Sequence, residues 1–447
     1  MTEITDDRSK TLLPALALGL TTLAFIIAKT GRDALFFQGS RGLLQLPLIY
    51  INIAAAALPL SVVFVNVMKR WGARPARLAI FTLAATGMAG AAPFLRPGDN
   101  LLMLVTFMFI PAIFGLLFAS LWLLASDIFE KNDKKVAAGA FSKIAAATLA
   151  GGMIGGLIAK GLATFLDPNW LILLAACTIL GVLVLVHYMH RRFPTNLMRN
   201  KTSREARGQI FAPFKNHYAL TLLLISMTGA LTGLLIDFQF YAAAASARMA
   251  AKDNASFFAN FYILLNFSSL LLQLFATPRI QHKIGLRGGL MVLPVALIGG
   301  ATFATAAATA LSRSVLRVTE GGVRSSVHRS IWEQAFIPVD STERSLVKIA
   351  VDGVGARLAE GLGAITLLIW LKQAVPDGVI DGPLDTGWIS WAILATVAIW
   401  LLVTQKFSAQ VTRGNDVRIK SQSPQDIVCE RFPDQCPCTT ELGKGIA

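Results

Sequence analysis

Long apolar blocks separated by short polar segments run through almost the whole chain. Most blocks have the length, about 17–25 residues, of a helix that crosses a hydrocarbon core of about 30 Å. The pattern therefore predicts an all-α polytopic membrane protein with about twelve transmembrane helices. The predicted spans are Leu12–Ala28, Leu46–Met68, Leu78–Phe94, Leu101–Ser126, Val136–Phe165, Trp170–Tyr188, Ala219–Ala245, Phe257–Thr277, Gly288–Leu311, Ser312–Phe336, Leu346–Leu371 and Trp388–Val403.

The tenth block carries several charged side chains, so hydropathy alone does not identify it as a span. The basic loops support it. Clusters of Lys and Arg follow every second predicted span, and loops rich in these residues stay on the cytoplasmic side. Without the tenth span this alternation would break. We therefore expect both termini to be cytoplasmic.

The composition excludes several classes of protein. Hydrophobic residues make up 54% of the chain and charged residues 15%, whereas a soluble domain is about 45–50% apolar and about 25% charged. A soluble enzyme, a disordered chain and a secreted disulfide scaffold are thereby excluded. The net charge is +15, and the basic residues follow the loop pattern. We therefore expect a lipid bilayer, and no nucleic acid, as the partner of these residues.

Two six-span halves repeat each other. Arg70-Trp-Gly-Ala-Arg74 follows the second span, and Lys283-Ile-Gly-Leu-Arg287 follows the eighth. Trp122 and Trp332 occupy matching places in the two halves. Parallel halves of this kind are typical of major-facilitator transporters. The predicted organisation is a first half at 1–190, a basic cytoplasmic linker at 191–217, a second half at 218–405 and a disordered cytoplasmic tail at 406–447.

Ionisable side chains inside predicted spans are the candidate functional residues, because charge in a membrane is costly. Arg32 and Asp33 lie at the end of the first span and can pair with each other. Lys29 nearby fits either a site or snorkelling to the interface. Asp237 lies in an otherwise apolar run and needs a cation, for which Lys29 and Arg32 are candidates. A purely structural ion pair between the halves remains an alternative.

The tenth span carries its charges on one helical stripe, and the eleventh carries a second group. Arg317 and Arg324 belong to the stripe, with Arg313, Glu320 and His328 at spacings of three or four. Three arginines cannot face lipid, and arginine forks bind phosphate or carboxylate at two points. The alternative is structural pairing with Glu320 and Glu333. The candidates of the eleventh span are Lys348, Asp352 and Arg357.

Several kinds of chemistry leave no mark in the sequence. No phosphate-cradling Gly-x-x-x-x-Gly-Lys-Ser/Thr motif is present, and no metal-ligand spacing such as His-Glu-x-x-His occurs. No nucleophile and base are visible together. We therefore expect a protein that is not an enzyme and holds no metal or cofactor. Cys429, Cys436 and Cys438 in the tail lack a clear fourth ligand for a metal.

Several motifs resemble the ATP/ADP translocases of plastids and intracellular bacteria, above all their short bacterial relatives. These are Arg32-Asp33-Ala-Leu-Phe, Trp122 with Asp127-Ile-Phe and Gly151-Gly152, Asp237-Phe-Gln-Phe240, Arg324-Ser-Ser-Val-His-Arg329, and Asp352-Gly-Val-Gly-Ala-Arg357. The resemblance covers the first eleven spans. It implies a major-facilitator-like nucleotide transporter (an ATP:ADP antiporter or a relative) in a bacterial inner membrane. It also implies that Arg32, Asp237 and Lys348 stand where the translocases have functional residues. The acidic residue of their fourth span has no counterpart between Phe107 and Trp122.

The function we predict is secondary transport of an anionic, phosphorylated or nucleotide-like solute by a monomer. The predicted substrate-binding residues are Arg32, Asp33, Asp237, Arg317, Arg324, Lys348, Asp352 and Arg357. In this hypothesis Asp33, Asp237 and Asp352 orient the cations of the empty site, and the substrate displaces them. The alternatives are a proton-coupled permease for another solute, with Asp237 or Asp33 as proton carrier, and a membrane scaffold that transports nothing.

Overall fold

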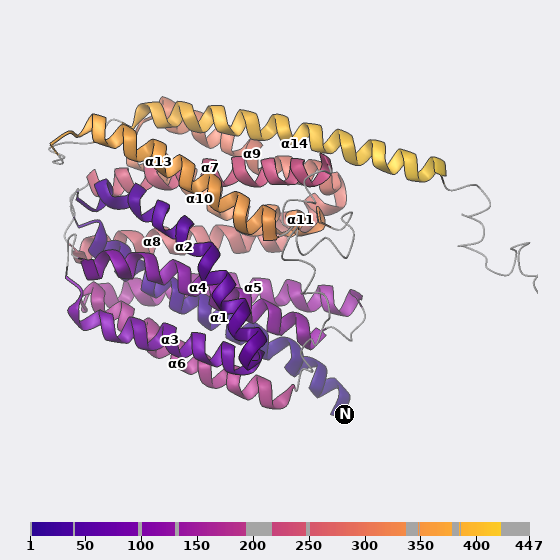
Figure 1. Cartoon of the computed structure of the whole chain (residues 1–447), viewed down its shortest axis with the longest axis horizontal. Helices are drawn as coiled ribbons and strands as arrows, with labels where there is room; N and C mark the ends of the chain where they lie inside the picture. Colours follow the sequence, from indigo (N-terminus) through magenta and orange to yellow (C-terminus); the bar gives the residue numbers. More distant parts are fainter. Residues whose placement is uncertain are drawn as a thin grey trace, which may run out of the picture.

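Helices running along one common direction make up the described part of the computed structural model, as Figure 1 shows. The described residues are 2–38, 41–96, 101–129, 134–193, 217–246, 251–336, 347, 349–377, 384 and 386–421, and they contain no β-strand. The helices of the first half are α1 (Thr2–Phe36), α2 (Arg41–Trp71), α3 (Ala73–Ala91), the short 3-10 helix η1 (Ala92–Phe94), α4 (Leu101–Phe129), α5 (Lys134–Ala163) and α6 (Pro168–Arg192).

The described part of the second half contains three π-helical segments among its α-helices. Such segments occur often at functional sites, because the extra residue per turn re-aims side chains. The elements are α7 (His217–Ser246), α8 (Ala251–Leu271), η5 (Leu272–Ala276), α9 (Thr277–Ala306), α10 (Ala310–Val323), η6 (Arg324–His328), α11 (Arg329–Gln334), η7 (Ile349–Gly355), α13 (Ala356–Ala374) and α14 (Gly387–Ser421). The π segments are η5, η6 and η7.

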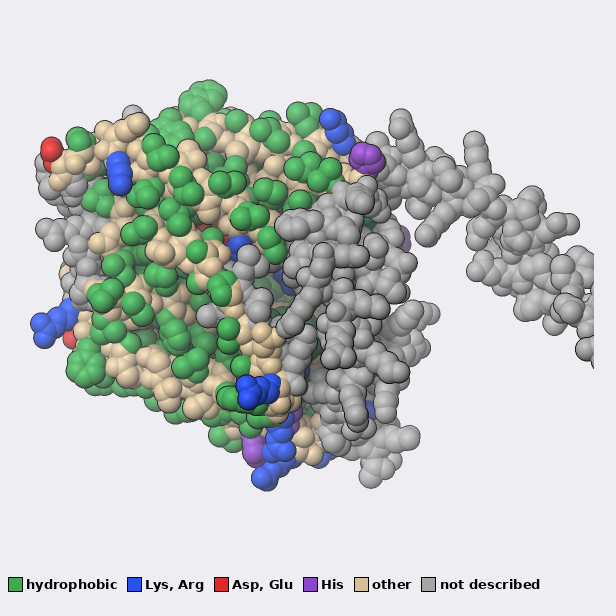
Figure 2. Space-filling view, viewed as in Figure 1, with side chains coloured by type: hydrophobic (Ala, Val, Ile, Leu, Met, Phe, Trp, Pro, Cys, Tyr) green, Lys and Arg blue, Asp and Glu red, His purple; other side chains and the backbone are tan. Residues whose placement is uncertain are grey.

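The all-α polytopic fold predicted from the sequence is confirmed. Within the described ranges, nine helices are long and apolar enough to cross a membrane. The tenth predicted span is the rod of α10, η6 and α11, and the eleventh is the rod of η7 and α13. Both rods carry charged side chains. Figure 2 shows a largely hydrophobic flank, with Lys and Arg gathered mainly at the ends of the bundle.

The chain enters and leaves the bundle at the same end. In Figure 1 the N-terminus and the far end of α14 both lie on the right. We call the opposite end, where α1 finishes at Phe36, the distal end. Helix α14 continues past position 406, where the predicted tail begins, to Ser421. Positions 194–216, which hold most of the predicted linker, and 422–447 lie outside the described residues.

The central glycine of each repeated basic loop has a positive φ angle. Gly72 has φ +89° and Gly285 has φ +59°, and these are the positive-φ glycines of the described chain. They are the central glycines of the two motifs recognised in the sequence. An L-residue with a side chain is strained in this region, so the turn itself explains why both motifs contain glycine.

Helix α5 packs against α1 of its own half and α8 of the other half. The glycines of α5 face two different helices, α1 and α8. A Cβ at Gly151 or Gly155 would meet the backbone of Gly19 or Leu23 in α1, whereas a Cβ at Gly156 would meet Ile263 in α8. Helices α2 and α13 form the second long contact between the halves. Small residues let helix backbones approach closely where no hydrophobic drive exists between lipid-embedded helices.

We predict that Gly155→Ala destabilises the protein, because its Cβ would lie 2.6 Å from the Leu23 carbonyl oxygen. Overpacking of this kind costs about 1–3 kcal/mol. Gly90→Ala in α3 is the matched control, since a Cβ there meets nothing within 4 Å and alanine favours helix by about 0.5–1 kcal/mol. Melting temperatures in detergent would compare the two variants. Equal melting temperatures would contradict the close contact of α5 with α1.

Candidate functional site

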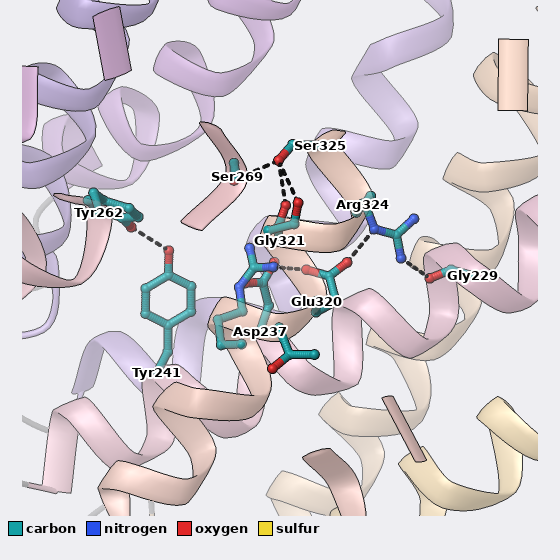
Figure 3. A network of polar contacts seen from close by, with 12 residues as sticks. Gly229, Asp237, Tyr241, Tyr262, Ser269, Glu320, Gly321, Arg324 and Ser325 are labelled. Carbon is teal, nitrogen blue, oxygen red and sulfur yellow. Dashed lines mark hydrogen bonds and ion pairs between the residues drawn. The ribbon is translucent and has the colours of Figure 1, made fainter. Parts of the chain in front are cut away.

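Four charged side chains on α7 and the α10 rod form what we call the central network: Asp237, Arg317, Glu320 and Arg324. Arg317 contacts two carboxylates. Its Nε lies 2.5 Å from Asp237 Oδ1, and its Nη1 donates a hydrogen bond to Glu320 Oε2. The other carboxylate oxygen of Glu320 accepts from Arg324 Nε. Figure 3 shows Glu320 between Asp237 and Arg324. Spacings of three and four residues place both arginines on the same face as Glu320.

The members of the central network differ in their access to solvent. The Glu320 side chain is only 2% exposed, whereas Asp237 is 26% and Arg324 36% exposed. A buried charge without a partner is strongly destabilising, which accounts for Glu320 having two arginines. Asp237 and Arg324 therefore keep part of their surface accessible, whereas Glu320 is enclosed.

Backbone and aromatic contacts hold Arg324 in place. Its Nη2 donates to the Gly229 carbonyl of α7 at 2.9 Å, as Figure 3 shows. Its Cζ lies 5.6 Å from the ring centroid of Trp400 in α14. A Cβ at Gly233 would sit 3.4 Å from both Arg324 and Glu320. The guanidinium is therefore positioned by three helices before any ligand arrives.

In the first half, Arg32 and Asp33 pair with each other at the end of α1. Arg32 Nε and Nη2 both donate to Asp33 Oδ1, at 2.7 and 2.5 Å. The Arg32 guanidinium also covers the Phe107 ring of α4 at 3.9 Å and donates to its carbonyl oxygen at 3.3 Å. Both charged side chains are buried. This pair is neutral and enclosed, so it borders the site without offering a free charge to it.

Two tyrosines of the second half complete the surroundings of Asp33. The Tyr262 hydroxyl of α8 donates to Asp33 Oδ2 at 2.5 Å, and the Tyr241 hydroxyl of α7 donates to the same oxygen at 3.1 Å. The two hydroxyls lie 3.5 Å apart (Figure 3). We call Asp33, Tyr241 and Tyr262 the tyrosine latch. It joins α1 to the opposite half at the distal end.

Lys29 stands apart because it forms no ion pair with any carboxylate among the described residues. Its ammonium lies 4.7 Å from the ring centroid of Tyr262 and 5.9 Å from that of Phe25. It is close enough to the charges of Asp33, Asp237 and Arg317 to interact with them electrostatically. Lys29 therefore places an uncompensated cation between the halves, beside the central network.

The eleventh-span candidates lie on the η7–α13 rod and only partly join this site. Arg357 pairs with Glu360 at 2.5 Å. Asp352 accepts a hydrogen bond from Trp332 Nε1 at 2.8 Å. The role of Asp352 in orienting a cation stays a prediction. Lys348 lies outside the described residues.

The structure therefore brings together Asp237, Arg317 and Arg324, with the Arg32–Asp33 pair at their edge. The cation that meets Asp237 is Arg317, rather than the predicted Lys29 or Arg32. The sequence reasoning left out Lys29, Glu320, Tyr241 and Tyr262 as site residues. The spacing of Glu320 between two arginines was a usable signal for its role. No signal in the sequence pairs the two tyrosines with Asp33.

A metal site is not found in this part of the protein. Among the described residues, no three His, Cys, Asp or Glu side chains are placed to hold a metal ion. The charges instead form pairs between arginine and carboxylate, which suits reversible exchange with an anion. Counting Lys29 with the central network gives three cations against two carboxylates.

We predict that Glu320→Gln destabilises the protein strongly, because Arg317 and Arg324 then share no buried carboxylate. Breaking a buried pair costs about 3–5 kcal/mol. The matched control is Asp167→Asn, whose carboxylate is 69% exposed and pairs with a 50% exposed Lys252; such a pair contributes about 1 kcal/mol or less. Thermal unfolding in detergent would measure both. A control as destabilised as Glu320→Gln would show that Glu320 has no special structural role.

Comparisons with known proteins show the fold of this chain. No protein-family model and no curated protein sequence matches it. Among solved structures, the nucleoside transporter NupG is similar with a TM-score of 0.62 and 12% identity, over 90% of this chain and 98% of that one. The POT family transporter PepTSo has a TM-score of 0.62 and 11% identity, over 89% and 98% of the two chains. The xylose transporter XylE from E. coli, partially occluded and inward-open, has a TM-score of 0.61 and 12% identity, over 90% and 99%.

These similarities support the major-facilitator-like fold over nearly the full length of the neighbouring proteins. Because the identities are only 11–12%, the similarities are evidence for the architecture alone. They do not single out the ATP/ADP translocases among the transporters that share this architecture.

Proposed function

We propose that this protein is a secondary-active transporter for a small anionic solute, with a phosphorylated or nucleotide-like compound as the preferred class. The observation that carries the proposal is Lys29. It lies between the halves and has no carboxylate partner in the described part of the chain, beside a network in which every other charge is paired. An anion would compensate this excess positive charge.

The exchange of partners explains how such a solute binds without a large electrostatic cost. In the structure Asp237 pairs with Arg317, and Glu320 pairs with both arginines. An incoming phosphate can bind the Lys29 ammonium and an arginine guanidinium at the same time, since both groups bind phosphate oxygens. Because Asp237 is the more exposed carboxylate, it can leave Arg317 and become hydrated, whereas Glu320 stays to hold Arg324.

Alternating access follows from the positions of the side chains that bind the solute. Lys29 belongs to α1 of the first half, and Arg317 and Arg324 belong to the α10 rod of the second. A solute held by both halves is enclosed between them and released when the halves tilt the other way. Transporters in the major-facilitator-like fold place their sites at this interface, which is where the central network and Lys29 lie.

The orientation that fits this proposal has both termini in the cytoplasm of a bacterium, with the protein in the inner membrane. The two described ends lie on the same side of the bundle (Figure 1). Basic loops follow every second span and stay cytoplasmic. The distal end, with the tyrosine latch, then faces the outside. The resemblance of the motifs to the ATP/ADP translocases supports a nucleotide-like solute.

We predict that Lys29→Gln lowers uptake into proteoliposomes at least tenfold while membrane abundance stays normal. The variant removes the unpaired cation and leaves every ion pair of the central network in place. Radiolabelled AMP, ATP, glucose 6-phosphate and inorganic phosphate are the solutes to assay, each exchanged against internal solute and, separately, driven by a proton gradient.

The matched control is Lys160→Gln, since Lys160 is an exposed lysine of α5. It should transport like the unaltered protein. Uptake of uncharged solutes only, or transport unaffected by Lys29→Gln, would contradict an anion site at Lys29. Uptake that needs the proton gradient and no counter-solute would favour a proton-coupled permease over an exchanger.

A further inference from the structure

We propose that Tyr262 couples the binding of an anion at Lys29 to opening of the distal end of the bundle, which makes it a positioning residue for transport. The proposal rests on the anion site described above and adds a route from that site to a contact between the halves. Tyr262 contacts two side chains of α1 that differ in kind: a cation that faces the site and a carboxylate that holds the distal end closed.

The geometry places both contacts on one tyrosine. Lys29 and Asp33 are four residues apart on α1 and therefore lie on the same face, one turn apart. The Tyr262 ring lies 4.7 Å from the Lys29 ammonium, and its hydroxyl lies 2.5 Å from Asp33 Oδ2. The ring and the hydroxyl thus bind the same helix of the opposite half through separate interactions.

The contacts around the tyrosine latch close the distal end. The Phe37 ring stacks on Tyr241 at 4.4 Å, and the Asn254 side chain of α8 donates to the Phe37 carbonyl at 3.3 Å. A small cluster of Ala34, Ala163 and Ala255 lies buried between α1, α5 and α8. Opening this end would break the Tyr–Asp hydrogen bonds but would leave Asp33 paired with Arg32 within α1. No charge would be stranded, so the latch can open reversibly.

An anion acts on this arrangement by competing for Lys29. The Tyr262 ring attracts the Lys29 ammonium by a cation–π interaction. This attraction becomes weaker when an anion binds the ammonium. One of the two attachments of Tyr262 to α1 is then weakened, and the distal end opens more readily. The Tyr262 hydroxyl stabilises the closed distal end through its hydrogen bond to Asp33. The Tyr262 ring makes the contact with Lys29 that an anion weakens.

The test reports distal opening through a cysteine at Ala255, which is buried in the closed state. Cys177, Cys429, Cys436 and Cys438 are first replaced by serine, and Ala255→Cys is labelled with a membrane-impermeant maleimide in nanodiscs. Labelling rates are measured without ligand, with inorganic phosphate, with AMP and with adenosine as the uncharged control. Binding is measured separately, as the shift in melting temperature.

We expect phosphate or AMP to speed labelling severalfold and adenosine to leave it unchanged. Tyr262→Phe should label faster than the parent without ligand and still respond to the anion, because it loses the hydroxyl and keeps the ring. Tyr241→Phe, which loses the other latch hydroxyl, should behave in the same way. Tyr262→Leu should lose the response to the anion while its melting temperature still shifts on binding.

The outcomes separate this proposal from the proposed function. Binding that depends on Lys29, together with labelling that ignores the anion, would overturn the coupling and leave the anion site intact. A response that survives in Tyr262→Leu would also overturn it. If neither phosphate nor AMP shifts the melting temperature, the proposed site itself fails for these solutes. Basal labelling unchanged in Tyr262→Phe would refute the latch without reference to any ligand.

Discussion

The cost of placing charge among lipid-embedded helices governs the centre of this protein. An ionised side chain taken out of water must be paired, or it destabilises the fold. Glu320 satisfies the requirement by contacting two arginines, and Asp33 by contacting Arg32 and two tyrosines. Arg324 and Arg32 are fixed in turn by a backbone carbonyl and an aromatic ring, and Arg317 by a second carboxylate, that of Asp237. Lys29 departs from this rule among the described charges, and in the proposed function an anionic solute pairs with it.

The same constraint links the site to motion. Charges that are paired within one half stay paired when the halves tilt, so their burial does not oppose the movement. Arg32 with Asp33 and Glu320 with Arg317 and Arg324 are pairs of this kind. The contacts that cross between the halves include hydrogen bonds from tyrosines and asparagine, an aromatic stack, the glycine face of α5 and the packing of α2 against α13. These are interactions that break and re-form at moderate cost.

Much of the fold follows from the sequence because a membrane imposes simple rules. Apolar length predicts the spans, and the two basic motifs predict the repeat, whose central glycines Gly72 and Gly285 share a positive φ. The charged stripe identified Arg317 and Arg324 as residues that avoid lipid. The partner of Asp237 was missed, since a single sequence does not show which helix of the bundle faces which. For the same reason the contact of Tyr262 with Asp33 could not be predicted.

The central claim is that the unpaired cation at Lys29 is the binding point of an anionic solute. The most direct measurement is ligand-induced thermal stabilisation of the purified protein with matched pairs: AMP against adenosine, and glucose 6-phosphate against glucose. A ligand that binds the folded state raises its melting temperature. The account predicts a rise with a phosphorylated member of a pair, none with its uncharged counterpart, and loss of the rise in Lys29→Gln. Equal stabilisation by the uncharged compounds, or a rise that persists in Lys29→Gln, would contradict it.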